Sequence, residues 1–165
     1  MFQLKAISSE SIPVALEKAE RYRLLNEPWF AESICSDILE VDPQNRKAIV
    51  IMLLAITDQF GTNSMTDVSQ ARKLLPLLTD EYDRTYYAGL ICERHGKSTL
   101  HKGIWEGGFI AYEWLREAMD HYEKAEKIRP AGNDDAILRW NTCARMIMRH
   151  HLEPRNEEYT EPLLE

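Results

Sequence analysis

The chain has 165 residues, of which 44% are hydrophobic and 28% are charged, a composition typical of a globular domain with a real core. Its formal net charge of −7 argues against a surface for nucleic acid or for an anionic membrane, since both need a concentrated excess of Lys and Arg. The longest apolar run, residues 48–56, is shorter than the about 20 residues that a transmembrane helix needs.

The three cysteines of the chain, Cys35, Cys92 and Cys143, are far apart and form no CxxC pair. This spacing offers neither a zinc knuckle nor a thioredoxin-like motif, and each cysteine lies in an apolar-periodic segment. We therefore expect buried free thiols in a reducing compartment. Because residues 1–6 show no secretory signal, the sequence predicts a cytoplasmic protein.

Helical spacing dominates, and no stretch alternates apolar and polar residues for long enough to predict a strand. The apolar stripes predict an all-α domain over residues 11–151. Its expected helices are seven, at residues 11–25, 28–41, 45–60, 67–78, 80–95, 109–129 and 134–151. Residues 1–10 are expected to be an N-terminal extension, and residues 152–165 a poorly ordered acidic tail.

Proline and glycine mark the expected ends of these helices. Pro28 and Pro43 cannot continue a helix but fit its first turn. Gly96 is expected to end the fifth helix. Residues 96–108, which contain three further glycines, are then expected to form a long loop that carries Trp105. In such a loop Trp105 either anchors a partner or packs on the neighbouring helix pair.

One spacing pattern repeats: a small residue, a larger one four positions on, another apolar residue three positions later, and proline five positions after that. It occurs twice with identical spacing, in Ala31, Cys35, Ile38 and Pro43 and in Ala118, Tyr122, Ala125 and Pro130. A weaker copy lies between them at Ala71, Leu75 and Leu78, with Asp83 in the proline position. The small residue lets two antiparallel helices approach closely, and the proline ends the second helix at a fixed distance.

With this pattern the sequence resembles the tetratricopeptide repeat, over about residues 11–130. The family's first helix commonly carries a small residue three positions before an aromatic, as Ala19 and Tyr22 do, and Gly89 with Cys92 matches in part. The resemblance implies antiparallel helical hairpins stacked as a short solenoid, with helix 134–151 as a cap. The copies are offset by 40 and 47 residues, where the family period is about 34.

The resemblance further implies that the first helix of each hairpin lines a concave groove that binds a partner protein. The candidate residues in this groove, with the aromatic loop residue added, are Leu16, Glu20, Arg23, Leu24, Val50, Leu54, Tyr86, Leu90, Arg94 and Trp105. They are more apolar than basic, and the Lys, Arg and Asn cluster with which some family members hold a C-terminal carboxylate is not found. An extended or helical apolar segment is therefore the expected partner.

The search for reaction chemistry yields no catalytic motif, and no metal or cofactor is expected. Glu117 and His121 lie four residues apart and could share a metal, but a solvated pair on a helix surface is the simpler interpretation. Residues 96–98 (Gly-Lys-Ser) lack the glycine that a phosphate-binding loop has five residues before its Gly-Lys pair.

Three functions remain open from the sequence. The first is an adaptor or scaffold domain that binds another protein, with no nucleic acid or membrane as partner and with a homo-oligomer as one option. The second is a cytoplasmic chaperone for a secreted or assembled substrate. The third is an enzyme with a site near residues 96–109. Opposite charges in the last helix and the tail also suggest that the tail folds back on that helix.

Overall fold

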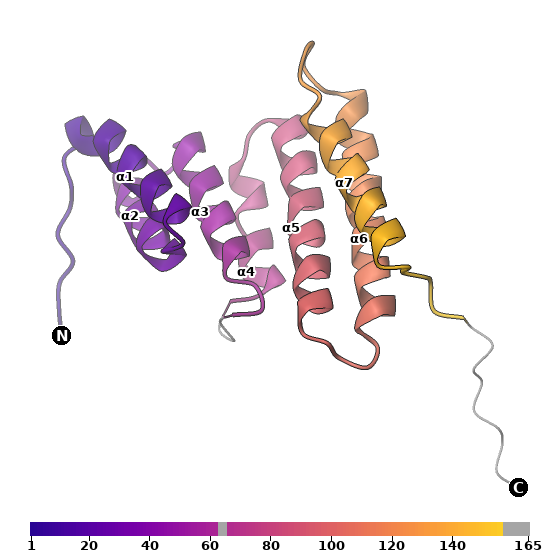
Figure 1. Ribbon diagram of the computed structural model, residues 1–165. Coiled ribbons are helices and arrows are strands. Elements are labelled where there is room, and N and C mark those ends of the chain that lie inside the picture. Colours follow the sequence, from indigo (N-terminus) through magenta and orange to yellow (C-terminus); the bar gives the residue numbers. More distant parts are fainter. Residues whose placement is uncertain (63–65, 157–165) are drawn as a thin grey trace, which may run out of the picture.

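The computed structural model describes residues 1–62 and 66–156, and over these ranges it contains helices and no strand (Figure 1). A 3-10 turn at Ser9–Ser11 precedes seven α-helices. These are α1 (Ile12–Leu24), α2 (Pro28–Val41), α3 (Arg46–Asp58), α4 (Val68–Arg72), α5 (Glu81–His101), α6 (Gly107–Lys127) and α7 (Asp135–Arg149). The predicted all-α class is confirmed.

Short polar side chains and prolines begin the helices where the sequence places them. Pro28 is the first residue of α2, where its missing N–H group is not needed. The side chains of Asn45, Asp67 and Asp80 accept hydrogen bonds from backbone N–H groups in the first turns of α3, α4 and α5. Each cap satisfies a donor that has no partner within the helix.

The helices run alternately up and down and form an elongated array from the N-terminal to the C-terminal end of the described chain (Figure 1). Each helix packs against its neighbour in sequence. The odd-numbered helices also contact one another in series, α1 with α3, α3 with α5 and α5 with α7. These four helices therefore share one side of the array, which we call the inner side.

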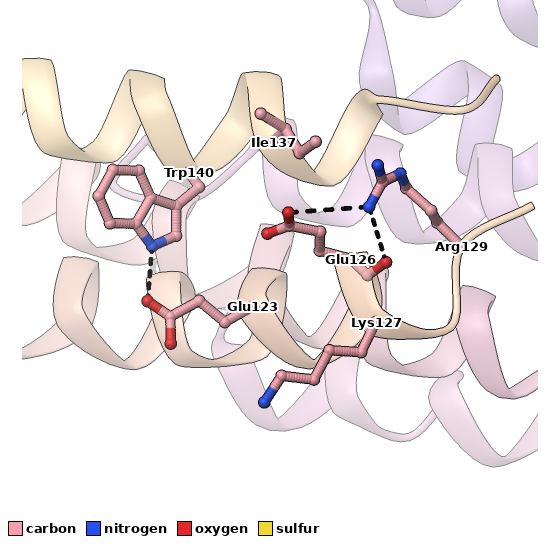
Figure 2. Close-up of a pocket in the computed structure, with 6 residues that line it drawn as sticks. All are labelled: Glu123, Glu126, Lys127, Arg129, Ile137 and Trp140. Atoms are coloured by element: carbon pink, nitrogen blue, oxygen red, sulfur yellow. Dashed lines mark hydrogen bonds and ion pairs between the residues drawn. The ribbon is translucent and has the colours of Figure 1, made fainter. Parts of the chain in front are cut away.

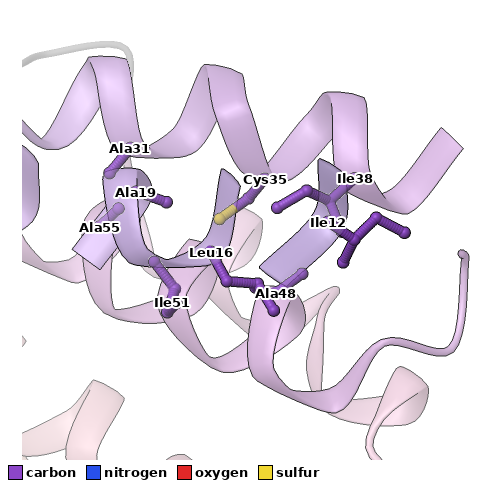
Figure 3. Close-up of a cluster of buried hydrophobic side chains, with 9 residues drawn as sticks. All are labelled: Ile12, Leu16, Ala19, Ala31, Cys35, Ile38, Ala48, Ile51 and Ala55. Carbon is purple, nitrogen blue, oxygen red and sulfur yellow. The ribbon is translucent and has the colours of Figure 1, made fainter. Parts of the chain in front are cut away.

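Three clusters of apolar side chains hold the array together. In the first, side chains from α1, α2 and α3 point toward one another (Figure 3). Leu53, Phe60, Ala71 and Leu90 belong to the second, between α3, α4 and α5. The third lies between α5, α6 and α7, around the fully buried Tyr122. Each buried Leu, Ile or aromatic side chain contributes about 1.5–3 kcal/mol by leaving water.

The positions of the repeated pattern are core positions. The six apolar residues of the two full copies are completely buried: Ala31, Cys35, Ile38, Ala118, Tyr122 and Ala125. In the weaker copy Ala71 and Leu78 are buried, and Leu75 is half-buried. The spacing thus marks the buried faces of α2 and α6, and in the weaker copy it spans α4 and the 3-10 turn that follows.

Two predicted helix boundaries are wrong. The helix expected at 67–78 is the short α4 followed by a 3-10 turn at Leu75–Leu77, because Pro76 cannot donate to the α-helical ladder. The helix expected at 80–95 continues as α5 to His101. Gly96 lies inside α5, where a Cβ would lie 3.1 Å from the Trp114 Cβ and 3.3 Å from the Ala111 carbonyl oxygen. Gly96 therefore permits close helix packing instead of ending the helix.

Because α5 continues to His101, the long loop predicted at residues 96–108 is wrong, and a short turn connects α5 to α6. No helix among the described residues has the length and apolar character of a membrane span. Residues 157–165, most of the predicted tail, lie outside the described residues. Before them, Leu152 packs on the third cluster and Arg155 forms an ion pair with Glu106 at 3.0 Å.

Candidate functional site

The sequence-predicted binding residues are divided by the structure into three groups. Leu16 and Leu90 are buried core residues of the first and second clusters, so their assignment to a binding surface is wrong. The helix faces that carry Leu16 and Leu90 pack against the neighbouring helices and do not face the solvent. The candidates with exposed side chains are Glu20, Leu24 and Trp105, and those with partly buried side chains are Arg23, Val50, Leu54, Tyr86 and Arg94.

Two of these candidates, Arg23 of α1 and Arg94 of α5, meet at one carboxylate on the inner side. Arg23 Nε donates to Asp58 Oδ2 at 2.7 Å, and Arg94 Nη1 donates to Asp58 Oδ1. Arg94 Nη1 also lies 3.1 Å from the Thr57 hydroxyl oxygen. Asp58 at the end of α3 thus links three inner helices, and both guanidinium groups have a partner within the chain.

A second carboxylate, Glu93, links α5 to α6 and α7. Glu93 is only 5% exposed. Its Oε1 accepts from Arg139 Nη1 at 3.0 Å and its Oε2 accepts from the Tyr122 hydroxyl at 2.5 Å. Burial and the nearby Glu93 charge raise the pKa of Tyr122, so its hydroxyl stays protonated and can donate. Burial lowers the pKa of Arg139, but the Glu93 carboxylate and the hydrogen bond to Tyr86 together outweigh burial and raise it.

Beside these two carboxylates lie two adjoining cavities, of about 530 and 470 Å³. The first lies between the ends of α3 and α5 and reaches Arg139 of α7. The second lies between α5 and the C-terminal half of α7. Lys97 and His101 line both cavities. We call the combined feature the α5–α7 groove.

The α5–α7 groove is basic, in a chain that is acidic as a whole. Its lining includes the cations Arg94, Lys97, Lys102, Arg139, Arg145 and Arg149. The carboxylates in the lining, Asp58 and Glu93, already accept from arginines. Lys97, Lys102, Arg145 and Arg149 form no ion pair with a described residue. Four cationic groups thus remain available to an anionic ligand.

A larger cavity of about 680 Å³ lies between α6 and α7 (Figure 2). Four of its polar side chains form two pairs: Trp140 Nε1 donates to Glu123 Oε1 at 2.9 Å, and Arg129 Nη1 lies 3.7 Å from Glu126 Oε1; Lys127 also lines the cavity. Charges of both signs line it, so it shows no preference for one kind of ligand. The α5–α7 groove is the better candidate because it brings together four cations that form no ion pair with any described residue.

The sequence does not reveal this groove for two reasons. Its pattern predicts a loop at residues 97–102, and it indicates that the last helix is only a cap. A helical signal was nevertheless present, because Arg94, Lys97 and His101 follow at i, i+3 and i+7, and Arg145 and Arg149 at i and i+4. The cationic cluster combines the C-terminal part of α5, beyond the predicted end of that helix, with the last helix, α7.

Comparisons with known proteins add no relative. No protein-family model matches the chain, and neither a curated protein nor a solved structure is significantly similar to it.

Proposed function

We propose that this chain is a protein-interaction module with a tetratricopeptide-like arrangement of helices, and that it binds an acidic, extended segment of a partner polypeptide in the α5–α7 groove. The observation that carries the proposal is a row of cations, Lys97, Lys102, Arg145 and Arg149, that form no ion pair within residues 1–62 and 66–156 and lie along a groove on the inner side. In this proposal the chain is a cytoplasmic binding protein without catalytic activity.

Two features support the repeat architecture. Packing between sequence neighbours together with contacts from each odd helix to the next is the pattern of stacked helical hairpins. The repeated small and apolar positions are fully buried in α2 and α6, and Ala71 of α4 is buried at the corresponding place in the weaker copy. The larger offset of 47 residues reflects the length of α5 and α6, which have 21 residues each.

The charge of the groove changes the expected partner from apolar to acidic. The apolar candidates Leu16 and Leu90 belong to the core and cannot contact a ligand. The exposed ammonium and guanidinium groups can instead donate charge-assisted hydrogen bonds to carboxylates. A polypeptide fits better than a nucleic acid, because a chain with net charge −7 repels a long polyanion outside the groove.

The test is fluorescence polarisation with a labelled ten-residue peptide of alternating Glu and Ala, compared with the same peptide carrying Gln for Glu. We expect the acidic peptide to bind and its affinity to fall as salt rises, because exposed charges are screened. The double variant Lys97→Glu/Arg149→Glu should weaken binding at least tenfold. Equal affinity for the two peptides would contradict the proposal.

The matched control is Lys18→Glu/Lys124→Glu, which makes the same change in net charge at exposed positions of α1 and α6 outside the lining of the groove. It should reduce binding only slightly. A loss equal to that of the groove variant would mean that the peptide responds to total charge and not to the groove.

A further inference from the structure

Three side chains with different metal-binding atoms come together on the α5–α6 hairpin. Cys92 of α5 lies beside Glu117 and His121 of α6, and their ligand atoms all lie within 4.8 Å of one another. His121 Nε2 is 3.9 Å from Glu117 Oε1. From the sequence, only the Glu117 and His121 pair was visible; the fold adds a thiol from a residue far earlier in the chain.

We propose that Cys92, Glu117 and His121 form a binding site for Zn²⁺. A thiolate, an imidazole and a carboxylate are the ligand types that zinc takes in proteins. With bonds of about 2.0–2.3 Å, a tetrahedral zinc ion separates its ligand atoms by about 3.3–3.8 Å. The observed spacing approaches this range, so small side-chain rotations close the site without moving either helix.

The depth of the three residues suits a metal at the edge of the core. Cys92 is fully buried, His121 is partly buried and Glu117 is exposed. The core side supplies a thiol and an imidazole that packing holds in place. The Glu117 side gives the ion a path from solvent and leaves a fourth coordination position for water.

The guanidinium of Arg72, in α4, already places a positive charge beside the three proposed zinc ligands. Its Nη2 lies 3.2 Å from Glu117 Oε1 and 3.8 Å from Cys92 Sγ, and its guanidinium lies over the Trp114 ring at 5.4 Å. The Arg72 side chain is 46% exposed, and an exposed ion pair of this kind contributes little to stability. A zinc ion can therefore displace the guanidinium into water, and Arg72 acts as its competitor.

The site lies outside the α5–α7 groove, since none of its three residues lines that groove. The zinc proposal does not depend on the proposed peptide binding. Each can fail alone: a protein that binds zinc but no acidic peptide would overturn only the proposed function.

The test is a titration of the reduced, metal-free protein with Co²⁺, which replaces Zn²⁺ and reports on its ligands by absorption. We expect a thiolate-to-cobalt charge-transfer band and the visible bands of a tetrahedral ion, both lost when Zn²⁺ is added. Cys92→Ser should abolish the charge-transfer band, and His121→Ala should weaken Co²⁺ binding at least tenfold. Arg72→Met should tighten it.

Cys35→Ser is the matched control, because Cys35 is an equally buried thiol in the first cluster; it should leave the band unchanged. Circular dichroism shows whether each variant is folded. If Cys92→Ser does not fold, Glu117→Gln, a substitution at an exposed position, takes its place in the test. Absence of the band in the wild-type protein, or its persistence in folded Cys92→Ser, would overturn the proposal. So would unchanged Co²⁺ affinity in both Glu117→Gln and His121→Ala.

Discussion

Gly89 shows how one residue sets the distance between two helices. It lies in α5 opposite Tyr122 of α6, and a Cβ built on it would be 2.8 Å from Tyr122 Cε1 and 3.1 Å from His121 Cβ. The Tyr122 ring cannot easily retreat, because it is fully buried and its hydroxyl bonds to Glu93. The hairpin of α5 and α6 therefore requires a residue without a side chain at this position.

We predict that Gly89→Ala lowers the free energy of unfolding by about 1–3 kcal/mol, the usual cost of forcing an extra methyl group into a packed interior. Gly108→Ala is the control, because the nearest atom to a Cβ there is Leu152 Cδ2 at 3.8 Å. Without a clash, the helical preference for Ala should make that variant neutral or more stable by up to about 1 kcal/mol. Urea denaturation of both variants measures the difference, and equal effects would contradict this account.

The two glycines of α5 also show what a single sequence can reveal. Gly89 matches a small-residue position of the repeat, and its close packing could be expected. The sequence predicts a helix end at Gly96, but in the structure Trp114 and Leu115 of α6 pack over it. A glycine that ends a helix and one that admits a neighbouring helix look alike until the neighbour is known.

At the scale of helices, the predictions succeed where local signals act alone. The starts of α2 and α3 follow from Pro28 and from the capping Asn45, and both lie within a residue or two of the predicted positions. The end of α5 depends on packing against α6 and could not be read locally. Pro76 was a local signal that the prediction overlooked, and it separates α4 from the following turn.

Glu93 is the residue through which three helices are joined by polar contacts, because it bonds to Arg139 of α7 and Tyr122 of α6. We predict that Glu93→Ala lowers the free energy of unfolding by about 3–5 kcal/mol, since it leaves a half-buried guanidinium and a buried hydroxyl without their partner. Thermal and urea denaturation measure this cost.

Asp120→Ala is the control for the loss of a carboxylate. Asp120 is exposed and lies 4.0 Å from Arg116 one turn earlier on α6. Such a pair contributes little, so this variant should differ from the wild type by less than about 0.5 kcal/mol. If Glu93→Ala cost no more than Asp120→Ala, the buried network would have no structural role.

At the scale of the whole molecule, the all-α class and the buried faces of the repeat could be predicted, because hydrophobic spacing alone determines them. The α5–α7 groove could not, since it depends on which faces of two distant helices meet. Arg23 and Arg94 were chosen as binding residues from a helical-face argument. The fold brings them together, but on Asp58, whose two carboxylate oxygens each accept from one of the arginines.

The three cysteines lie in two of the core clusters, and their buried thiols make the stability of the molecule depend on alkaline pH. Burial raises the pKa of Cys35 and of Cys92 from 9.0 to about 12 and also raises the pKa of Cys143. In the unfolded chain these thiols lose their protons near pH 9, while in the folded chain they keep them. Above pH 9 the unfolded state therefore binds fewer protons, and the free energy of unfolding must fall as pH rises.

We predict that the reduced, metal-free protein loses about 4 kcal/mol of unfolding free energy between pH 8 and pH 10, since each thiol contributes roughly 1.4 kcal/mol per pH unit above its unfolded pKa. Urea denaturation at fixed ionic strength across this range measures the slope. Cys35→Ala should be less stable at pH 8, because it removes buried volume, but its loss between pH 8 and pH 10 should be smaller by about one third. A wild-type profile that is flat to pH 10 would mean that the thiols already ionise in the folded protein, which their complete burial forbids.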